Sequence, residues 1–205
     1  MNLIVKERLT PRIEASCTYV GVAVLTLLYL FPFVRVLWRI GDEGTFVYGA
    51  HRVLHGQLPG RDFFEPMGPG SFYWLAAFFR VFGESIGTAR GVLLLTGVTL
   101  TILTLFCSRR IALPATLPVL FTTVLCVPLW PGTSPHWDSN LFALAAFSVF
   151  LMWQRSRRPA LLAICGILSG ICFSVLQPKG ILICGAFVVS VCLLDRVGNK
   201  SRCPV

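Results

Sequence analysis

The chain has few charged residues, since Asp, Glu, Lys and Arg together make up 13% of its 205 residues. A soluble domain typically carries about a quarter, so this composition excludes an ordinary water-soluble fold. Hydrophobic residues make up 55%, and they are gathered in long runs instead of alternating with polar residues. One helical crossing of a bilayer needs roughly 17–25 apolar residues. The sequence therefore predicts an all-α, polytopic membrane helical bundle.

Acidic residues are scarcer still, and the formal net charge is +9. The basic residues stand in short clusters at the ends of apolar runs, which is how membrane topology is encoded. We therefore expect membrane lipids as partners and no nucleic acid. The eight cysteines follow no metal or disulfide spacing, and no Gly-rich nucleotide loop is present. These absences predict no cofactor and no bound metal.

The apolar runs predict a single transmembrane domain over residues 1–205 with about six transmembrane helices. The first run has no cleavage site after it and is interpreted as a retained span. Gly166 and Gly170 give the fifth span a small-xxx-small packing face. A tight turn over Gln177–Gly180 is expected between the last two spans. The predicted spans cover residues 17–34, 87–107, 111–130, 139–153, 159–176 and 180–194, and an outer loop covers residues 35–86.

The distribution of charge predicts the orientation. Six crossings place both termini and the loops at 108–110 and 154–158 on one side, with eleven of the eighteen Lys and Arg residues and three of the nine acids. The other side holds the remaining seven basic residues and six acids. The positive-inside rule makes the first side cytoplasmic. We expect a multi-pass protein of the cell membrane, inner or plasma, with both termini cytoplasmic.

The outer loop is predicted to contain two helices that lie in the membrane interface. Phe46, Ala50 and Leu54 fall on one helical stripe, as in an amphipathic interfacial helix. The apolar stretch Phe72–Phe82 is too short to cross a bilayer. An interfacial or re-entrant element is therefore expected there, joined to the first helix by a turn rich in Gly and Pro.

Ionisable groups from distant parts of the sequence converge on the outer side of this topology: Asp42, Glu43, Arg90, Asp138 and Lys179. Such groups are costly near a membrane and are candidates for function. Carboxylates can take a proton from an acceptor hydroxyl, and Arg and Lys can stabilise a phosphate.

Each of these groups also has a structural interpretation. The acids can cap helices, Arg90 can anchor a helix at the interface, and Lys179 can extend its ammonium group to water. His51 and His55 have the i, i+4 spacing of a metal pair, but they are not part of an H-E-x-x-H pattern.

The first outer loop resembles that of the GT-C membrane glycosyltransferases, in particular bacterial members similar to protein mannosyltransferases and aminoarabinose transferases. In those relatives an Asp-Glu pair follows the first span, an Asp precedes the fourth, and a Lys-Gly turn joins the fifth and sixth. Asp42, Glu43, Asp138 and Lys179-Gly180 match these positions. The resembling stretches are Asp42–Ala50, Gly56–Glu65, Gly68–Trp74, Phe82–Ser85 and Ala89–Arg90.

The resemblance implies transfer of a sugar from a polyprenyl-phosphate donor to an unknown acceptor (lipid, glycan or protein) on the outer face of the membrane. Asp42 is implied as the catalytic base, assisted by Glu43 and Asp138. Arg90 and Lys179 are implied to hold the lipid phosphate, with His136 as a further substrate-binding residue.

Two departures from the family are visible. Residues 65–69 lack the Lys that aminoarabinose transferases carry beside a Pro at this point, so the donor class stays open. Family members usually have several hundred residues, so a truncated or vestigial GT-C-like protein without activity is an alternative. A small membrane transporter is a second alternative, although the predicted spans carry almost no charge away from their ends.

Overall fold

The computed structural model describes residues 2–35, 42–64 and 67–200, and their side chains except those of residues 2–13, 42, 126 and 195–200. Every regular element in these ranges is a helix, which confirms the predicted all-α class. The helices are α1 (Asn2–Leu30), η1 (Phe31–Arg35), α2 (Asp42–Leu54), α3 (Gly70–Phe82), α4 (Ile86–Arg110), α5 (Thr116–Phe121), η2 (Thr122–Cys126), η3 (Val127–Leu129), α6 (Pro135–Ser156), α7 (Pro159–Val175) and α8 (Gln177–Lys200).

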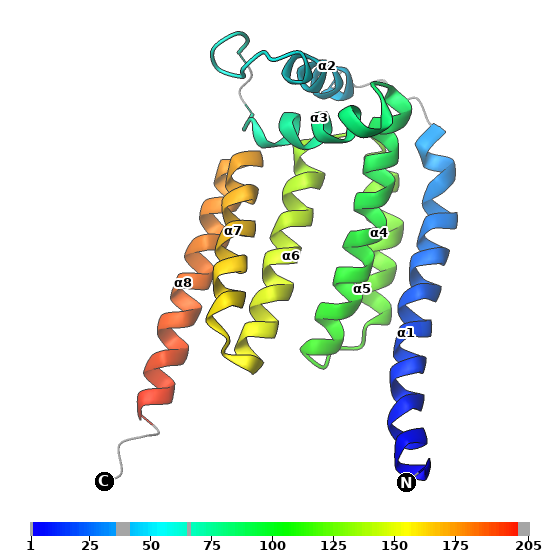
Figure 1. Ribbon diagram of the computed structural model, residues 1–205, viewed down its shortest axis with the longest axis vertical. Coiled ribbons are helices and arrows are strands. Elements are labelled where there is room, and N and C mark those ends of the chain that lie inside the picture. The colour runs from blue at the N-terminus through cyan, green and yellow to red at the C-terminus, as the bar shows by residue number, and fades with distance from the viewer. Residues whose placement is uncertain (1, 36–41, 65–66, 201–205) are drawn as a thin grey trace.

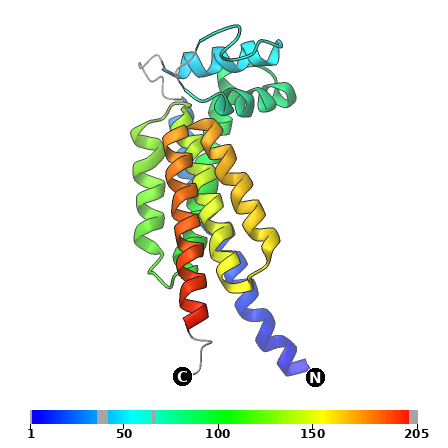
Figure 2. The same ribbon diagram turned by 90° about the vertical axis from the view of Figure 1, so that its left-hand side faces the viewer.

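Two groups of helices make up the molecule. Helices α1, α4, α5, α6, α7 and α8 run roughly along its long axis, and α2 and α3 lie across one end of this bundle (Figure 1). Figure 2 shows α3 between α2 and the bundle. The start of α1, the end of α8 and the α4–α5 and α6–α7 connections lie at the opposite end. The segments predicted for the two membrane faces are therefore separated in space.

Three helical segments are long and apolar enough to cross a membrane: Glu14–Arg35, Ile86–Arg110 and Gln177–Leu194. Few residues of the first and third are buried in the protein, whereas half of the second is buried. Exposed apolar helices of this length are stable where lipid replaces water. These segments indicate a membrane protein, and six spans remain a prediction.

The third predicted span, residues 111–130, is not one regular helix. It consists of α5, one π-helical turn at η2 and one 3₁₀ turn at η3. Pro114 precedes α5 and Pro128 lies in η3, where the missing backbone donor and the clash of the ring with the preceding turn oppose a regular α-helix. Pro118 lies in the first turn of α5, where proline is tolerated.

The predicted turn at Gln177–Gly180 is wrong, because these residues form the first turn of α8. Proline is tolerated in a first helical turn, where its missing N–H has no helical partner. The chain instead reverses at Leu176, whose backbone is extended.

The predicted packing face of α7 is also wrong. A Cβ added at Gly166 or Gly170 would meet nothing within 4 Å. Close approaches occur at other glycines. A Cβ on Gly68 would lie 2.2 Å from the carbonyl oxygen of Ser174, and one on Gly180 would lie 2.3 Å from Cα of Phe173. These glycines bring the α3 connection and α8 against the end of α7.

The apolar stripe of α2 packs on protein. Phe46 and Ala50 are buried, and the Phe46 ring stacks on Phe72 of α3 with centroids 5.7 Å apart. Ala50 belongs to a cluster that continues through Phe79 of α3 to Ala89 at the start of α4. The two helices predicted in the outer loop are present, and the apolar stripe of the first faces α3 and α4. Their position in the membrane interface stays a prediction.

Candidate functional site

The candidate site lies where α2 and α3 cover the end of the bundle. The starts of α4 and α6 hold several of its residues, and a serine caps each of these helices. Ser85 caps α4 by accepting a hydrogen bond from the Thr88 N–H at 3.0 Å. Ser134 caps α6 by accepting one from the His136 N–H at 3.3 Å, and Pro135 follows it in the first turn. Asp138 therefore lies inside the first turn of α6, and the interpretation of Asp138 as its cap is wrong.

Arg90 and Glu43 form a buried ion pair. Arg90 Nε donates to Glu43 Oε1 at 3.1 Å and Nη2 donates to Oε2 at 2.8 Å. Only 7% of the Arg90 side chain and 13% of the Glu43 side chain are exposed. Arg90 Nη1 also donates to the carbonyl oxygen of Val34 at 2.9 Å. One guanidinium group thus joins the end of η1, the start of α2 and the start of α4.

Asp138 is buried without an ion-pair partner among the described residues. Burial raises the pKa of this carboxyl, which precedes the predicted fourth span, to about 7, and the nearby Ser71 hydroxyl lowers it to a smaller extent. In the described part of the chain, the buried Trp74 Nε1 has no hydrogen-bond partner, and the buried Ser71 Oγ has none besides its interaction with the Asp138 carboxyl. Unsatisfied buried polar groups are rare and often mark a place for water or a ligand.

Trp74 also links α3 to α6, because its ring lies edge-on to Phe142 with centroids 5.2 Å apart. Ser71 and Trp74 are three residues apart on α3, and Asp138 and Phe142 are four apart on α6. Both spacings put the residues on one helix face. The start of α6 therefore meets a face of α3 that combines aromatic rings with polar groups.

Lys179 reaches across from α8 to α6. Its Nζ donates to Ser139 Oγ at 2.9 Å and to Asn140 Oδ1 at 2.6 Å. Both partners are neutral, and no acid in the described ranges pairs with this ammonium group. An ammonium group has three donors, so these two contacts leave one donor of Lys179 for a further partner.

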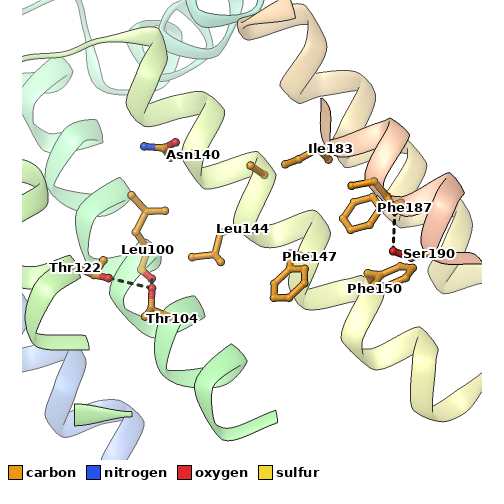
Figure 3. Close-up of a pocket in the computed structure, with 12 residues that line it drawn as sticks. Leu100, Thr104, Thr122, Asn140, Leu144, Phe147, Phe150, Ile183, Phe187 and Ser190 are labelled. Carbon is orange, nitrogen blue, oxygen red and sulfur yellow. Dashed lines mark hydrogen bonds between the residues drawn. The ribbon is translucent and has the colours of Figure 1, made fainter. Parts of the chain in front are cut away.

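An apolar groove of about 510 Å³ runs between α4, η2, α6 and α8 (Figure 3). Its α6 wall extends from Asn140 to Phe150, about 15 Å at 1.5 Å per residue. Asn140 lies at the end nearest α2 and α3, so the groove begins beside the Lys179 contact. The groove is lined by Leu100, Thr104, Thr122, Asn140, Ala143, Leu144, Phe147, Phe150, Ile183, Ala186, Phe187 and Ser190.

The remaining predicted site residues lie at the same end of the molecule. Asp42 is the first residue of α2, and its side chain lies outside the described residues. His136 is exposed in the first turn of α6. Gly132 lies beside Glu43, since a Cβ on this glycine would be 3.9 Å from the Glu43 Cβ. The loop before α6 thus approaches the start of α2.

Glu84 was missed as a site residue by sequence reasoning. It lies between α3 and α4, and its carboxylate contacts Nδ1 of His51 and lies 3.8 Å from Nδ1 of His55. The histidine pair was visible from its i, i+4 spacing. Glu84 is separated from His51 by 33 residues, and no local pattern connects them.

Comparisons with protein-family models, curated proteins and solved structures find no match to this chain.

Proposed function

We propose that the protein is a membrane glycosyltransferase that moves a sugar from a polyprenyl-phosphate donor to an acceptor. The reaction takes place at the end of the bundle that carries α2 and α3, which we assign to the outer face of the cell membrane, with both termini cytoplasmic. The resemblance of the first outer loop to GT-C enzymes motivates this proposal.

The observation that carries the proposal is the groove with Lys179 beside one of its ends. A polyprenyl phosphate has a long apolar chain and one anionic head. The groove offers a largely apolar channel for the chain, and Lys179, which contacts the groove residue Asn140, offers a basic group for the head. An ammonium–phosphate contact is stronger than a neutral hydrogen bond.

Asp138 provides the acid–base chemistry. In the proposed step the acceptor hydroxyl oxygen bonds to the sugar C1, the bond from C1 to the phosphate oxygen breaks, and the hydroxyl proton passes to a carboxylate. A base works best when its pKa is near the working pH, and Asp138 meets this condition. Lys179 stabilises the charge on the departing polyprenyl phosphate. Asp42 remains a second candidate base at the start of α2.

We assign Glu43 and Arg90 a positioning role, because they are paired with one another and not directed at a free anion. Their ion pair fixes the start of α2, and hence Asp42, against α4. His136, exposed in the same turn as Asp138, is proposed to contact the acceptor or the sugar.

The groove assignment is tested by donor binding to the purified chain in nanodiscs. Ala186 lines the groove, so Ala186→Trp is expected to fill it and weaken binding of a long polyprenyl phosphate at least about tenfold. Val188, on the same helix, is 58% exposed, and Val188→Trp serves as the matched control. Equal binding by the two variants would remove the groove from the proposal.

A further inference from the structure

We propose that His51, His55 and Glu84 bind one Zn²⁺ ion that fastens α2 to the α3–α4 connection. This inference does not depend on the proposed transferase activity. The three residues each offer a ligand atom, and these atoms all lie within 4.8 Å of one another. His51 lies in the last turn of α2 and His55 directly follows the end of this helix, and their ring centroids are 4.3 Å apart.

The ligand atoms of this cluster favour a transition metal ion. Two imidazole nitrogens and one carboxylate suit Zn²⁺ and similar transition metals, whereas Mg²⁺ and Ca²⁺ prefer oxygen ligands alone. Three protein ligands leave a fourth tetrahedral position for water. The side chains of His51, His55 and Glu84 are 45%, 57% and 34% exposed, so an ion can enter from solution.

The hydrogen bonding of His55 supports this assignment. Its Nδ1 lies 2.9 Å from the carbonyl oxygen of His51, and a carbonyl can only accept, so Nδ1 carries the proton. Metal-binding histidines commonly donate their other ring N–H to a backbone carbonyl in this way. His55 Nε2 is therefore the nitrogen with a free electron pair.

Without an ion, the contacts among His51, His55 and Glu84 stabilise the position of α2 only weakly. Exposed ion pairs contribute about 0–1 kcal/mol. A shared Zn²⁺ would join both rings to Glu84. The start of α2 is already fixed to α4 by Glu43 and Arg90. The ion would fix its other half beside Ser85, the residue that caps α4.

The experiment measures Zn²⁺ binding to the full chain in detergent, purified with a tag that contains no histidine. Cysteines are blocked with N-ethylmaleimide first, because Cys17, Cys184 and Cys192 are exposed thiols that bind zinc. Competition with a coloured chelator is expected to give one Zn²⁺ per chain with a Kd below about 10 µM. Co²⁺ in its place is expected to give the visible absorption bands of a tetrahedral site.

Substitutions test whether His51, His55 and Glu84 are the residues that bind the Zn²⁺ ion. His51→Ala and Glu84→Gln are each expected to weaken binding at least about tenfold and to abolish the rise in Tm that Zn²⁺ gives the native chain. His136→Ala is the matched control, since His136 is the third histidine of the chain and lies on α6. A variant is scored only if its Tm without metal equals that of the native chain. If His51→Ala or Glu84→Gln fails this criterion, His55→Gln replaces it and is scored in the same way.

The proposal is overturned if the native chain binds no Zn²⁺ below this Kd. It is also overturned if the scored cluster variants bind as the native chain does, or if His136→Ala weakens binding equally. Binding that is lost only in the cluster variants supports the proposed site.

Discussion

Lys179 Nζ donates a hydrogen bond to Asn140 Oδ1 at 2.6 Å, and Asn140 lines one end of the largely apolar groove. The first residue lies in the first turn of α8 and the second in α6, 39 positions apart. A cation held by neutral groups at the end of an apolar channel has the two chemical features of a lipid phosphate site. The account of function depends on this relationship more than on any other.

Lys179→Met is expected to weaken binding of a polyprenyl phosphate roughly ten- to a hundredfold, because hydrogen bonds to charged groups are worth about 1.5–3 kcal/mol. Binding of the uncharged polyprenol should change much less, since the groove itself is kept. Titration of both lipids into nanodiscs by native mass spectrometry provides the comparison. Arg61→Met, which changes an exposed cation outside the groove, is the control, and an equal loss in the control would contradict a specific role for Lys179.

Asp138→Asn is expected to change how stability depends on pH. The pKa of the Asp138 carboxyl is raised to about 7 in the folded protein and is near 4 in an unfolded chain. The folded state therefore holds the proton more tightly, and the native chain should lose stability as pH rises from about 4 to 7, by an amount on the order of a few kcal/mol.

The Asp138→Asn variant should lack this loss of stability with rising pH. It should be more stable than the native chain at pH 8, although not at pH 4. Thermal unfolding in detergent across this range measures both. Parallel curves for the two proteins would show that Asp138 titrates normally. A group kept at a cost to stability is expected at a functional site.

Arg90→Ala is expected to destabilise the fold by about 3–5 kcal/mol, because removing one member of a buried ion pair leaves the other charge without compensation. Arg90→Lys should also destabilise, since an ammonium group cannot make the two-pronged contact with Glu43. The matched control is Arg80→Ala, which changes an exposed Arg of α3 and should shift stability by less than about 0.5 kcal/mol. Equal Tm values for Arg90→Ala and Arg80→Ala would show that the Arg90–Glu43 ion pair does not stabilise the packing of α2 on α4.

Gly180→Ala is expected to lower stability by about 1–3 kcal/mol. Its new Cβ would lie 2.3 Å from Cα of Phe173, and backbone cannot move aside as a flexible side chain can. Gly185→Ala on the same helix meets nothing within 4 Å, so it should be neutral or gain up to about 1 kcal/mol from helix propensity. If α7 and α8 are packed as described, the unfolding midpoint falls for Gly180→Ala and is unchanged or rises for Gly185→Ala.

Hydropathy predicted where the helices lie because apolar runs and their basic ends are local features. Residues 87–107 and 159–176, for example, correspond to α4 and α7 within a few positions. The breaks in residues 111–130 come from prolines that were visible in the sequence, but their combined effect depends on packing. The start of α8 was missed because Gln177–Gly180 has the composition of a turn, and its close approach to Phe173 is not visible in the sequence.

The candidate site was predictable as a set of residues but not as a set of pairs. Convergence of Glu43, Arg90, Asp138 and Lys179 on one end of the bundle follows from topology. That Glu43 pairs with Arg90, while Asp138 and Lys179 have no charged partner among the described side chains, depends on distances between helices distant in sequence. For the same reason, the contact of Glu84 with His51 and His55 could not be predicted.

The most direct measurement of the central claim is sugar transfer by the purified chain in nanodiscs. A panel of polyprenyl-phosphate sugars with labelled sugar is offered together with lipid, glycan and protein acceptors from a membrane extract. The account predicts labelled product and released polyprenyl phosphate with the native chain, a loss of at least about a hundredfold for Asp138→Asn, and full activity for Val188→Trp. Transfer by Asp138→Asn at the native rate, or no transfer by a native chain that binds the donor, would contradict it.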